Sequence, residues 1–396
     1  MTFSYWWLFL LVLFLAGVLL NIHPLSALAI MLAVVSSLAR LWQRRSLEAV
    51  SYRRRLIYRR GFSGEKVPVR LEVENRKFLP ISWLRVKDPW PVPVAPEDDS
   101  VLTPTENSEM GLMINLFSLR WFERSAHAYQ ILFRKRGVYP LGPAVLESGD
   151  LFGLFEKTRQ EEAVEYLTVF PSPAPFNELQ LPADDPFGDR RARRRLYEDP
   201  TLPMGVRDYH PEDDFRRVHW PATAHTGEVQ VKVYQPTSAR VLVVCLNVAT
   251  NVHQWEGINQ PLLERLISVS TTLVQQAIQD GYQVGLISNG CLAHSDQPFR
   301  VPPGRSPQQM SQLLEALARV TPFLIWPFER FLLKEVPRLP YGATLLIVTG
   351  VTTSEFAETL LRLKQHSRRM TLLSFSHRLP PDIPGVRAIH LPFRER

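Results

Sequence analysis

The sequence predicts a multi-domain protein made of an N-terminal transmembrane helical hairpin, an antiparallel β-sandwich and an open α/β sheet. Three observations lead to this prediction. Two long apolar runs open the chain, short segments of alternating apolar and polar residues follow, and the remainder alternates between apolar strands and amphipathic helices. With 396 residues, the chain has room for roughly two to three domains.

The opening apolar runs are Phe3–Leu20 and Leu25–Trp42, separated by Asn-Ile-His-Pro. Each holds about 18 residues, close to the ~20 that cross a hydrocarbon layer as a helix. Tryptophans bracket the pair, as interfacial anchors do. A cleaved signal peptide, with Ala27-Leu28-Ala29 as its cleavage site, is the weaker interpretation, because no positive charge precedes the first run and a second run follows.

The positive charge of the chain is concentrated beside these runs. Residues 1–39 carry no charged side chain, whereas residues 40–60 carry eight arginines against Glu48, which equals the net charge of +7 for the whole chain. Positive charge next to a span favours the cytoplasmic side. We therefore expect a multi-pass protein of the cell (inner) membrane with most of its mass in the cytoplasm, and a basic collar that contacts anionic lipid. Nucleic acid is not an expected partner, since the collar directly follows a span.

Composition and motifs exclude several classes of protein. A 45% apolar content and a mean hydropathy of −0.09 exclude a disordered chain and a many-span transporter. Two cysteines, Cys245 and Cys291, exclude a disulfide scaffold and a four-cysteine zinc site. The sequence contains no Walker loop, GxGxxG, HExxH or GxSxG motif. We accordingly predict no catalytic residue, no metal and no cofactor.

We divide the chain into five parts by pattern. They are two transmembrane helices (1–44), a basic juxtamembrane segment (45–57), the β-sandwich (58–170), a Pro/Arg-rich connector with a distinctive segment (171–239) and the α/β domain (240–396). Within the sandwich, Pro89–Pro104 is expected to be a loop or an edge connection, because proline interrupts central strands. Within the connector, the basic cluster Arg190–Arg195 reads as a solvated face.

The α/β prediction depends on a series of apolar and amphipathic segments. Expected strands are 241–248, 282–287, 345–349 and 370–375, and expected helices are 260–280, 307–319 and 355–364. Alternation of this kind predicts parallel strands joined by right-handed crossovers.

The most distinctive stretch is Val206–Gln235. It resembles the signature of the bacterial "domain of unknown function 58" family, with matches at Arg207, Tyr209, Pro211, Asp213, Arg216, Val218, His219, Trp220, Thr223, Ala224, Thr226 and Gly227. Three further segments resemble family patterns: Glu72–Arg85, Arg134–Tyr139 and Asp150–Phe155. The sequence departs from the pattern at Glu212, where glycine is usual, and at His225, where arginine is usual.

The resemblance implies that the α/β domain is similar to a von Willebrand factor A domain. That family often binds Mg²⁺ through carboxylate and hydroxyl oxygens that follow the strands, as a hard cation requires. The corresponding positions here are Asn247, Ala249, Asn251 and Thr349, so both expected carboxylates are missing. We expect a degenerate, metal-free interaction surface; a metal-gated adhesion module that faces outward is an alternative.

Two interpretations of the signature segment remain open. In the first, Asp213 or Asp214 forms buried charge-assisted bonds with Arg216 and Arg217, and Trp220 packs beneath them, so that the segment docks the two large domains. In the second, the arginines and His219 form a ligand or partner surface. The interaction residues predicted on either interpretation are Arg207, Tyr209, Asp213, Asp214, Arg216, Arg217, His219, Trp220 and Thr223.

The predicted function is that of a membrane-tethered, cytoplasm-facing scaffold for protein–protein interaction, and not of an enzyme. The family resemblance implies that the scaffold works with a MoxR-type AAA+ ATPase in an envelope or chaperone-like process. The alternative from another class is a metal-dependent hydrolase that uses the segment from Asp213 to His225.

Overall fold

The computed structural model divides the chain into two compact units, residues 1–169 and 170–396, and each is described by itself. The structure describes residues 3–150, 155–181, 187, 197–211, 213–237, 240–293, 295, 297–340, 342–364 and 369–393. The basic cluster Arg190–Arg195 and Glu212 of the signature segment lie outside the described residues, as do residues 151–154.

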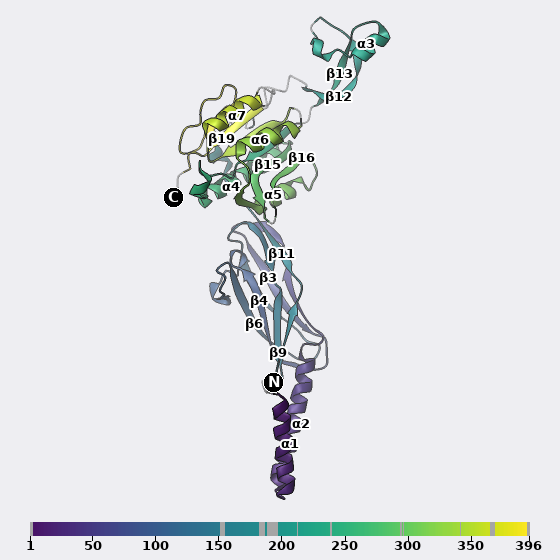
Figure 1. The fold of residues 1–396 in the computed structure, drawn as a ribbon, viewed down its shortest axis with the longest axis vertical. Coiled ribbons are helices and arrows are strands. Elements are labelled where there is room, and N and C mark those ends of the chain that lie inside the picture. Colours follow the sequence, from purple (N-terminus) through teal and green to yellow (C-terminus); the bar gives the residue numbers. More distant parts are fainter. Residues whose placement is uncertain are drawn as a thin grey trace. The chain divides into compact units, whose positions relative to one another are not determined.

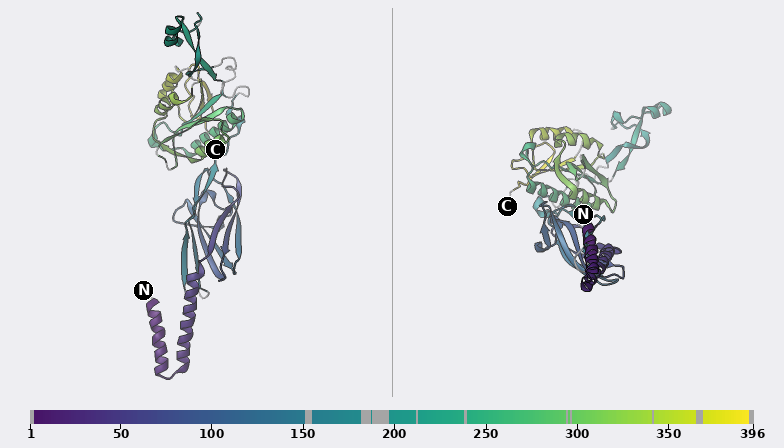
Figure 2. Two further views of the ribbon diagram at one scale, coloured as in Figure 1. Left: turned by 90° about the vertical axis from the view of Figure 1, so that its right-hand side faces the viewer. Right: turned by 60° about the horizontal axis from the view of Figure 1, so that its bottom comes forward.

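The chain begins with two antiparallel helices, α1 (Phe3–Leu19) and α2 (His23–Ser46), shown side by side in Figure 2. Asn21 makes the turn between them with a φ of 54°. Near this turn a Cβ on Gly17 would lie 2.7 Å from the backbone nitrogen of Ser26, so the glycine permits the close approach of the helices. At the other end, Trp6 Nε1 donates to Ser36 Oγ at 3.2 Å.

The two helices differ in their capacity to cross a membrane. In the part of the chain that the structure describes, α2 is the one helix that is long and apolar enough to do so, whereas α1, with 17 residues, is shorter. The sequence prediction of a helical hairpin is confirmed. The prediction of two spans is supported for α2 alone, which leaves a multi-pass arrangement as a proposal.

The rest of the first unit consists of antiparallel strands, here called the β domain (residues 50–169). Its strands are β1 (Val50–Leu56), β2 (Arg60–Phe62), β3 (Lys66–Asn75), β4 (Ile81–Pro91), β5 (Leu102–Pro104), β6 (Met110–Leu119), β7 (Arg124–Leu132), β8 (Gly137–Leu141), β9 (Ala144–Gly149), β10 (Glu156–Glu161) and β11 (Glu165–Phe170). They form sheets of order β1-β3-β7, β10-β9-β4-β6-β5 and β2-β11-β8. Side chains from these sheets share one hydrophobic core, which includes Leu71, Leu84 and Ile131.

The β domain begins earlier than predicted, because β1 occupies most of the expected juxtamembrane segment (45–57). The strand places Tyr52 and Arg54 inside and Arg53 and Arg55 outside, as the period of two requires. Because residues 53–55 are all arginines, their charge gives no sign of this alternation. Arg54 therefore does not belong to the basic collar: it is buried and bonded to Asp88.

The stretch Pro89–Pro104, expected to be a loop or an edge connection, is not a loop at its start. Strand β4 continues through Pro89 to Pro91 and pairs with β6 along this length. Its other neighbour, β9, pairs only with Leu84–Lys87. Pro89 and Pro91 thus lie where β4 lacks β9 as a hydrogen-bonded neighbour, which is the position where a sheet tolerates the missing N–H.

The second unit contains a mixed sheet and four surrounding helices (Figure 1). The strands are β14 (Val241–Leu246), β15 (Gln283–Leu292), β16 (Pro298–Gly304), β17 (Val320–Leu324), β18 (Thr344–Thr349), β19 (Arg369–Ser374) and β20 (Arg387–His390). The helices are α4 (Gln260–Gln279), α5 (Gln309–Arg319), α6 (Phe328–Glu335) and α7 (Ser354–Lys364). We call this body the α/β domain (residues 240–393).

The sheet has helices on both faces. Leu242, Val244 and Leu246 point to the face that α4 and α5 cover, whereas Val243 and Cys245 point to the face covered by α6 and α7. A strand buried on both sides reads as a continuous apolar run, as β14 does. Strands β14, β15, β18, β19 and β20 are parallel, which confirms the predicted α/β arrangement.

Several elements of the α/β domain differ from the prediction. The Gly/Pro-rich stretch before residue 307 contains β16, and β17 follows α5; both pair antiparallel with β15, so the sheet is mixed rather than wholly parallel. Helix α6 and strand β20 were not expected, because the first is short and the second lies among prolines and glycine. The predicted end of the helix 260–280 is confirmed, because α4 ends at Gln279 with Asp280 as its C-cap. The next residue, Gly281, has a φ of 80°.

The predicted connector (171–239) is more structured than expected. Ala174, Leu179 and Phe187 pack into the core of the α/β domain, beside α4. Further on, β12 (Tyr197–Asp208), α3 (Trp220–Thr226) and β13 (Gln230–Thr237) form a separate element, labelled in Figure 1, which we call the signature subdomain (197–237). An extended connector over the whole region is therefore not what the chain forms.

Candidate functional site

The signature subdomain is a two-stranded antiparallel ribbon that carries a loop and a short helix. Val206, Arg207 and Asp208 on β12 pair with Lys232, Val231 and Gln230 on β13. Between the strands, a 3₁₀ turn (Phe215–Arg217) leads into α3, and Gly227 ends the helix with a φ of 76°. Glycine tolerates this backbone conformation, so Gly227 turns the chain from α3 into β13.

The acidic residues of the loop hold its backbone in place. Asp213 accepts hydrogen bonds from Arg207 Nη1 and Nη2 at 2.6 and 2.5 Å, and from the His210 backbone N–H at 2.8 Å. Asp214 accepts from the Arg216 backbone N–H at 3.0 Å and so caps the 3₁₀ turn. The predicted pairing of an aspartate with Arg216 and Arg217 is therefore wrong for Asp213, whose partner is Arg207, and the pair is only partly buried, with the Arg207 side chain half exposed.

Hydrogen bonding by Arg207 and by the His210 N–H lowers the pKa of the Asp213 carboxyl from 3.8 to about 2. Both interactions favour the ionised form, which is the direction expected for a carboxylate with donors on both oxygens. Asp213 is thus an anion that holds a loop, not a proton donor near neutral pH.

His219 and Thr223 also act within the subdomain. His219 Nδ1 accepts from the Ala222 N–H at 3.0 Å and caps α3. Thr223 Oγ1 donates to the His219 carbonyl at 3.1 Å and accepts from the Gln230 N–H at 3.0 Å, which ties α3 to β13. Gln230 in turn donates to Asp208 Oδ1 at 2.6 Å. His225 lies in the last turn of α3.

Two large aromatic side chains of the subdomain are exposed. Trp220 is 64% exposed and Phe215 is 63% exposed, so Trp220 does not pack beneath the charged pairs as predicted. Tyr209 meets Phe215 edge-to-face, with ring centroids 5.7 Å apart. Arg216 and Arg217 are exposed beside Phe215. The sequence reasoning missed Phe215, although its place between Asp214 and two arginines is the signal that marks it.

The second predicted site lies at the carboxyl edge of the α/β sheet. When the parallel strands are numbered along the chain, their order across the sheet is 2-1-3-4-5. The second strand, β15, lies on one side of β14, and the later strands lie on its other side. This reversal creates a switch point between β14 and β18. In doubly wound sheets such a point forms the ligand crevice. Asn247 directly follows β14 and Thr349 ends β18, and both are buried.

A closed amide network occupies this switch point. Asn247 Nδ2 donates to Thr349 Oγ1 at 3.0 Å, and Asn247 Oδ1 accepts from Asn289 Nδ2 and from the Ala249 N–H, both at 3.0 Å. Asn289 Oδ1 accepts from the Val248 N–H at 3.0 Å, and Thr349 Oγ1 donates to the Val351 carbonyl at 2.7 Å. The prediction missed Asn289, although it follows an apolar run on β15 as Asn247 follows one on β14.

The remaining residue of the degenerate metal set points elsewhere. Asn251 Nδ2 donates to the carbonyls of Glu256 and Gly257, at 3.4 and 3.1 Å, and so shapes the loop before α4. Among the described residues, no group of three or more His, Cys, Asp or Glu side chains could hold a metal ion. The donors that do gather at the switch point are neutral and bonded to one another, which is a poor set for Mg²⁺.

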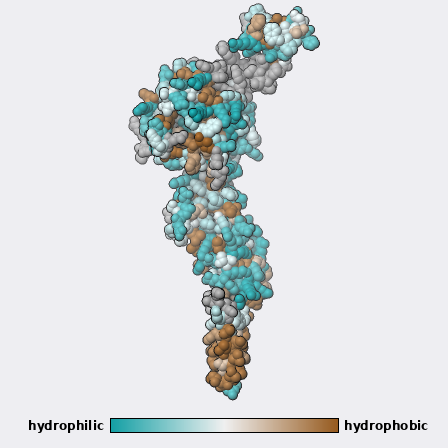
Figure 3. Space-filling model, in the orientation of Figure 1, coloured by the Kyte–Doolittle hydropathy of each residue, from teal (hydrophilic) through white to brown (hydrophobic). Residues whose placement is uncertain are grey.

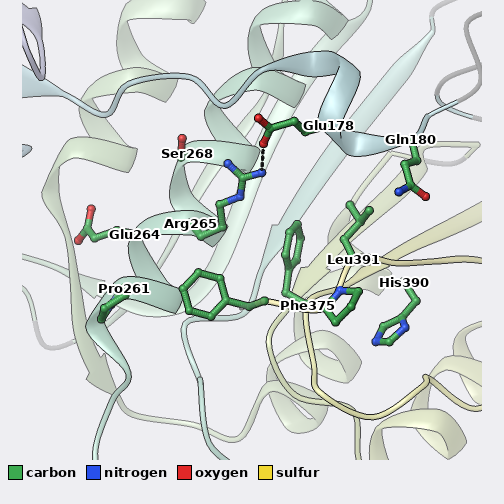
Figure 4. A pocket seen from close by; sticks show the side chains of 11 residues that line it. Glu178, Gln180, Pro261, Glu264, Arg265, Ser268, Phe375, His390 and Leu391 are labelled. Atoms are coloured by element: carbon green, nitrogen blue, oxygen red, sulfur yellow. Dashed lines mark hydrogen bonds and ion pairs between the residues drawn. The ribbon is translucent and has the colours of Figure 1, made fainter. Parts of the chain in front are cut away.

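An open cavity of about 740 Å³ lies beside this edge, between α4 and the segment that follows β20. Figure 4 shows the Arg265–Glu178 ion pair at its rim, with Phe375 and Leu391 at the apolar side and His390 nearby. In this pair Arg265 Nη2 lies 2.5 Å from Glu178 Oε2. His390 Nε2 lies 2.8 Å from the Ser376 carbonyl. Because its charged groups are bonded to the chain itself, the cavity offers shape more than reactive chemistry.

The other three family-like segments serve the β domain. Buried Asn75 donates to the Leu79 and Arg120 carbonyls, and Arg134 donates to three carbonyls between residues 92 and 96. Buried Asp150 accepts from the Phe155 N–H at 2.6 Å, and Tyr139 donates to the Lys135 and Arg136 carbonyls. The polar residues of these segments therefore stabilise turns.

The family model described as "Protein of unknown function DUF58" matches residues 205–367, a range that begins in the signature subdomain and ends after α7. Residues 205–367 of the chain are thus a region of the DUF58 family. The chain is also similar to the "Uncharacterized protein YeaD" of Bacillus subtilis (strain 168), which is 20% identical over 229 residues, or 58% of this chain. This chain spans about half of that relative, 53% of its length.

Solved structures show only distant likeness to this protein. The CARDB domain of the PF1109 protein of Pyrococcus furiosus is 10% identical with a TM-score of 0.21, and covers 30% of this chain and 91% of its own. A cohesin module of a Clostridium perfringens glycoside hydrolase is 13% identical with a TM-score of 0.21, and covers 30% and 96%. Likeness at this level carries no argument about function.

Proposed function

We propose that this protein is a membrane-tethered, cytoplasm-facing scaffold for protein–protein interaction that works with a MoxR-type AAA+ ATPase in an envelope or chaperone-like process. The observation that carries the proposal is the exposure of Phe215 and Trp220 on a subdomain in which Asp208, Asp213 and Asp214 are bonded to its own backbone and side chains.

The helical hairpin supports the tether. Figure 3 shows an apolar surface over α1 and α2, and the exposed side chains there include Leu8, Phe9, Leu11, Val12, Leu15, Ile30, Met31, Val34 and Leu38. An apolar patch of this kind on a water-soluble protein would be an aggregation hazard, whereas in lipid it needs no cover. Arg40, Arg44 and Arg45 in the last turns of α2 favour a cytoplasmic position for the chain that follows.

The signature subdomain supports the interaction role. Asp208, Asp213 and Asp214 all point at donors within the subdomain, which fixes the loop between β12 and α3. Such a loop presents Phe215 and Trp220 with little loss of conformational entropy on binding. Exposed Trp, Tyr and Arg side chains are the residues that most often supply the binding energy of interfaces.

The α/β domain also supports an interaction role, because the place where a ligand would be expected is bonded internally. Its switch point would be the default place for a ligand or a metal in a domain similar to a von Willebrand factor A domain. The Asn247–Asn289–Thr349 network uses the polar atoms of that place for internal bonding. We propose that this edge is a degenerate metal site that serves as a metal-free interaction surface.

The hydrolase alternative finds less support in the geometry. It needs a carboxylate or histidine of the 213–225 segment that is available to activate water or hold a metal. Asp213 and Asp214 accept from the loop, and His219 Nδ1 accepts from the Ala222 N–H. An adhesion module on the outer face would additionally need a metal-binding switch point.

The test is a capture experiment on the full chain in nanodiscs, with native membrane extract, in the presence of ATP or a non-hydrolysable analogue. We expect capture of an AAA+ ATPase that depends on the nucleotide. Replacement of Phe215 and Trp220 by serine should reduce capture at least tenfold. The matched control is Phe323→Ser, which removes an exposed aromatic side chain of the α/β domain.

Capture that is equal for the double variant and the control would contradict the proposed surface. Capture of no AAA+ protein under any nucleotide condition would contradict the proposed partner. Protease digestion of intact cells tests the orientation: cleavage of residues 50–393 from outside would contradict the cytoplasmic position.

A further inference from the structure

The end of α2 is fastened to one end of the β domain. Arg159 donates to the Leu47 and Val50 carbonyls at 2.7 and 2.6 Å, and Lys157 donates to the Arg44 carbonyl at 2.5 Å. Lys77 Nζ donates to the Ser46 and Glu48 carbonyls. Lys157 and Lys77 thus satisfy two of the carbonyls that the helix leaves free at its C-terminus, those of Arg44 and Ser46, and the other bonds hold the link between α2 and β1. The end of the β domain that contains Lys77, Lys157 and Arg159 therefore lies at the level of the last turn of α2.

Three exposed aromatic side chains lie at this same end. Phe78 is 76% exposed, Trp121 59% and Phe122 64%, and they come from the β3–β4 and β6–β7 connections. Phe78 stacks on Trp121 with ring centroids 5.8 Å apart and meets Phe122 edge-on at 6.2 Å. Water-exposed aromatic clusters of this size are uncommon without a binding role. We call Phe78, Trp121 and Phe122 the aromatic foot.

The aromatic foot is directly linked to the end of α2. Phe78 follows Lys77, whose amine bonds to the Ser46 carbonyl, and the Phe122 N–H donates to the Lys77 carbonyl at 3.3 Å. The Arg76 N–H donates to the Ala49 carbonyl at 2.9 Å. Both aromatic loops are thus bonded to one another and to the residues at the end of the helix.

Helix length places that point in the headgroup layer. Helix α2 has 24 residues, and about 20 residues suffice for the hydrocarbon core. The excess of roughly one turn corresponds to about 6 Å at 1.5 Å per residue, which is the thickness of the interfacial layer on one side. Ser46, and with it the aromatic foot, then lies level with lipid headgroups.

We propose that the aromatic foot inserts into the interfacial layer of the same membrane that α2 crosses, and so forms a second contact between the β domain and lipid. The inference rests on the proposed tether. Aromatic side chains favour this layer because their rings are apolar and polarisable while water remains near. Arg76, Arg120 and Arg124 are exposed near the foot; Arg76 and Arg124 share Glu74 as an ion-pair partner, so this group of four side chains keeps a net positive charge that favours anionic headgroups.

Phe122 supports a presenting role for its loop. Its φ of 51° is in the left-handed region, which costs a non-glycine residue free energy. The bonds of the Phe122 and Asn75 N–H groups, to the Lys77 and Glu123 carbonyls, hold the loop in this form. The chain thus keeps a bulky apolar residue where glycine would be easier, on an exposed tip.

The test measures the depth of a fluorescent label in anionic vesicles that contain the full chain. Cys245 and Cys291 are buried, so a thiol-reactive NBD probe will label an introduced cysteine. Three variants are compared: Phe122→Cys at the foot, Val34→Cys in α2 and Tyr58→Cys after β1. Because β1 leads away from α2 by about 20 Å over six residue steps, Tyr58 is the matched exposed control.

We expect nitroxide-labelled lipid headgroups to quench the probe at position 122 at least threefold more than at position 58. Replacement of Phe78 and Trp121 by glutamate in the Phe122→Cys background should abolish the difference. Quenching at position 34, by acyl-chain nitroxides, reports the tether separately. If position 34 is quenched but position 122 equals position 58, the aromatic foot does not insert and the inference is wrong while the tether stands.

Absence of quenching at position 34 would contradict the tether and with it the inference. Quenching at 122 that persists in the glutamate variant would mean that proximity, rather than insertion of the rings, brings the probe to the lipid, and would also overturn the inference. A partner protein on the foot would appear as protection of position 122 from lipid quenching in native membranes but not in vesicles.

Discussion

Asn247 Nδ2 donates a hydrogen bond to Thr349 Oγ1 at 3.0 Å, which joins the carboxyl ends of β14 and β18. The bond lies at the switch point of the sheet, which is where doubly wound sheets form a ligand crevice. In this chain two amides and one hydroxyl are bonded to one another there. These bonds link the ends of β14, β15 and β18.

Replacement of Asn247 by alanine should lower the free energy of unfolding by about 1–3 kcal/mol. It leaves Asn289 Nδ2 and the Ala249 N–H without their acceptor in a buried place. Asn251→Ala is the matched control, because Asn251 bonds at the surface, and should cost less than about 1 kcal/mol. Urea unfolding measures both, and equal costs would show that the network does not stabilise the edge.

A second prediction concerns the buried ion pair of the β domain. Asp88 accepts from Arg54 Nη2 at 2.6 Å, from Tyr52 at 2.6 Å and from Trp90 at 2.9 Å. Asp88→Asn removes the partner of a buried guanidinium and should cost about 3–5 kcal/mol. Glu72→Gln breaks the exposed pair with Arg55 and should cost no more than about 1 kcal/mol. Comparable unfolding midpoints for the two variants would contradict this assignment.

The third prediction is a pH dependence in the signature subdomain. The pKa of Asp213 is about 2 in the folded chain against an ordinary 3.8. Because the folded pKa is depressed, the stabilisation is complete above about pH 4 and is lost as pH falls toward 2. A carboxyl carbon titration by NMR should give a midpoint near 2, and Arg207→Gln should return it toward 3.8. A midpoint of 3.8 in the unsubstituted chain would show that the Arg207 contact does not form.

The fourth prediction concerns the two thiols. Cys245 and Cys291 are buried, and burial raises the pKa of the Cys245 thiol. Neither should react with a maleimide within an hour at neutral pH, because the thiolate is the nucleophile. Both should react in urea, which mass spectrometry counts directly. Rapid labelling of the folded protein would contradict the packing of β14 and β15.

Pattern alone was sufficient for the elements whose apolar periodicity is strong. The helical hairpin, strands β14, β15, β18 and β19, and helices α4, α5 and α7 follow from spacing, because a strand or helix must bury at least one face. The signature residues were identifiable for a different reason, which is the resemblance of Val206–Gln235 to a family pattern. Short or proline-bearing elements such as β16, α6 and β20 do not produce a sufficient periodic signal.

Which polar side chains bond to one another was decided by the tertiary structure. The arginine run of residues 53–55 shows charge, but only the sheet separates buried Arg54 from exposed Arg53 and Arg55. Asp213 could pair with several nearby arginines, and the fold of the loop that follows β12 places it against Arg207. Composition and local period determine the elements, whereas partners across tens of residues depend on which strands become neighbours, and no local pattern carries that information.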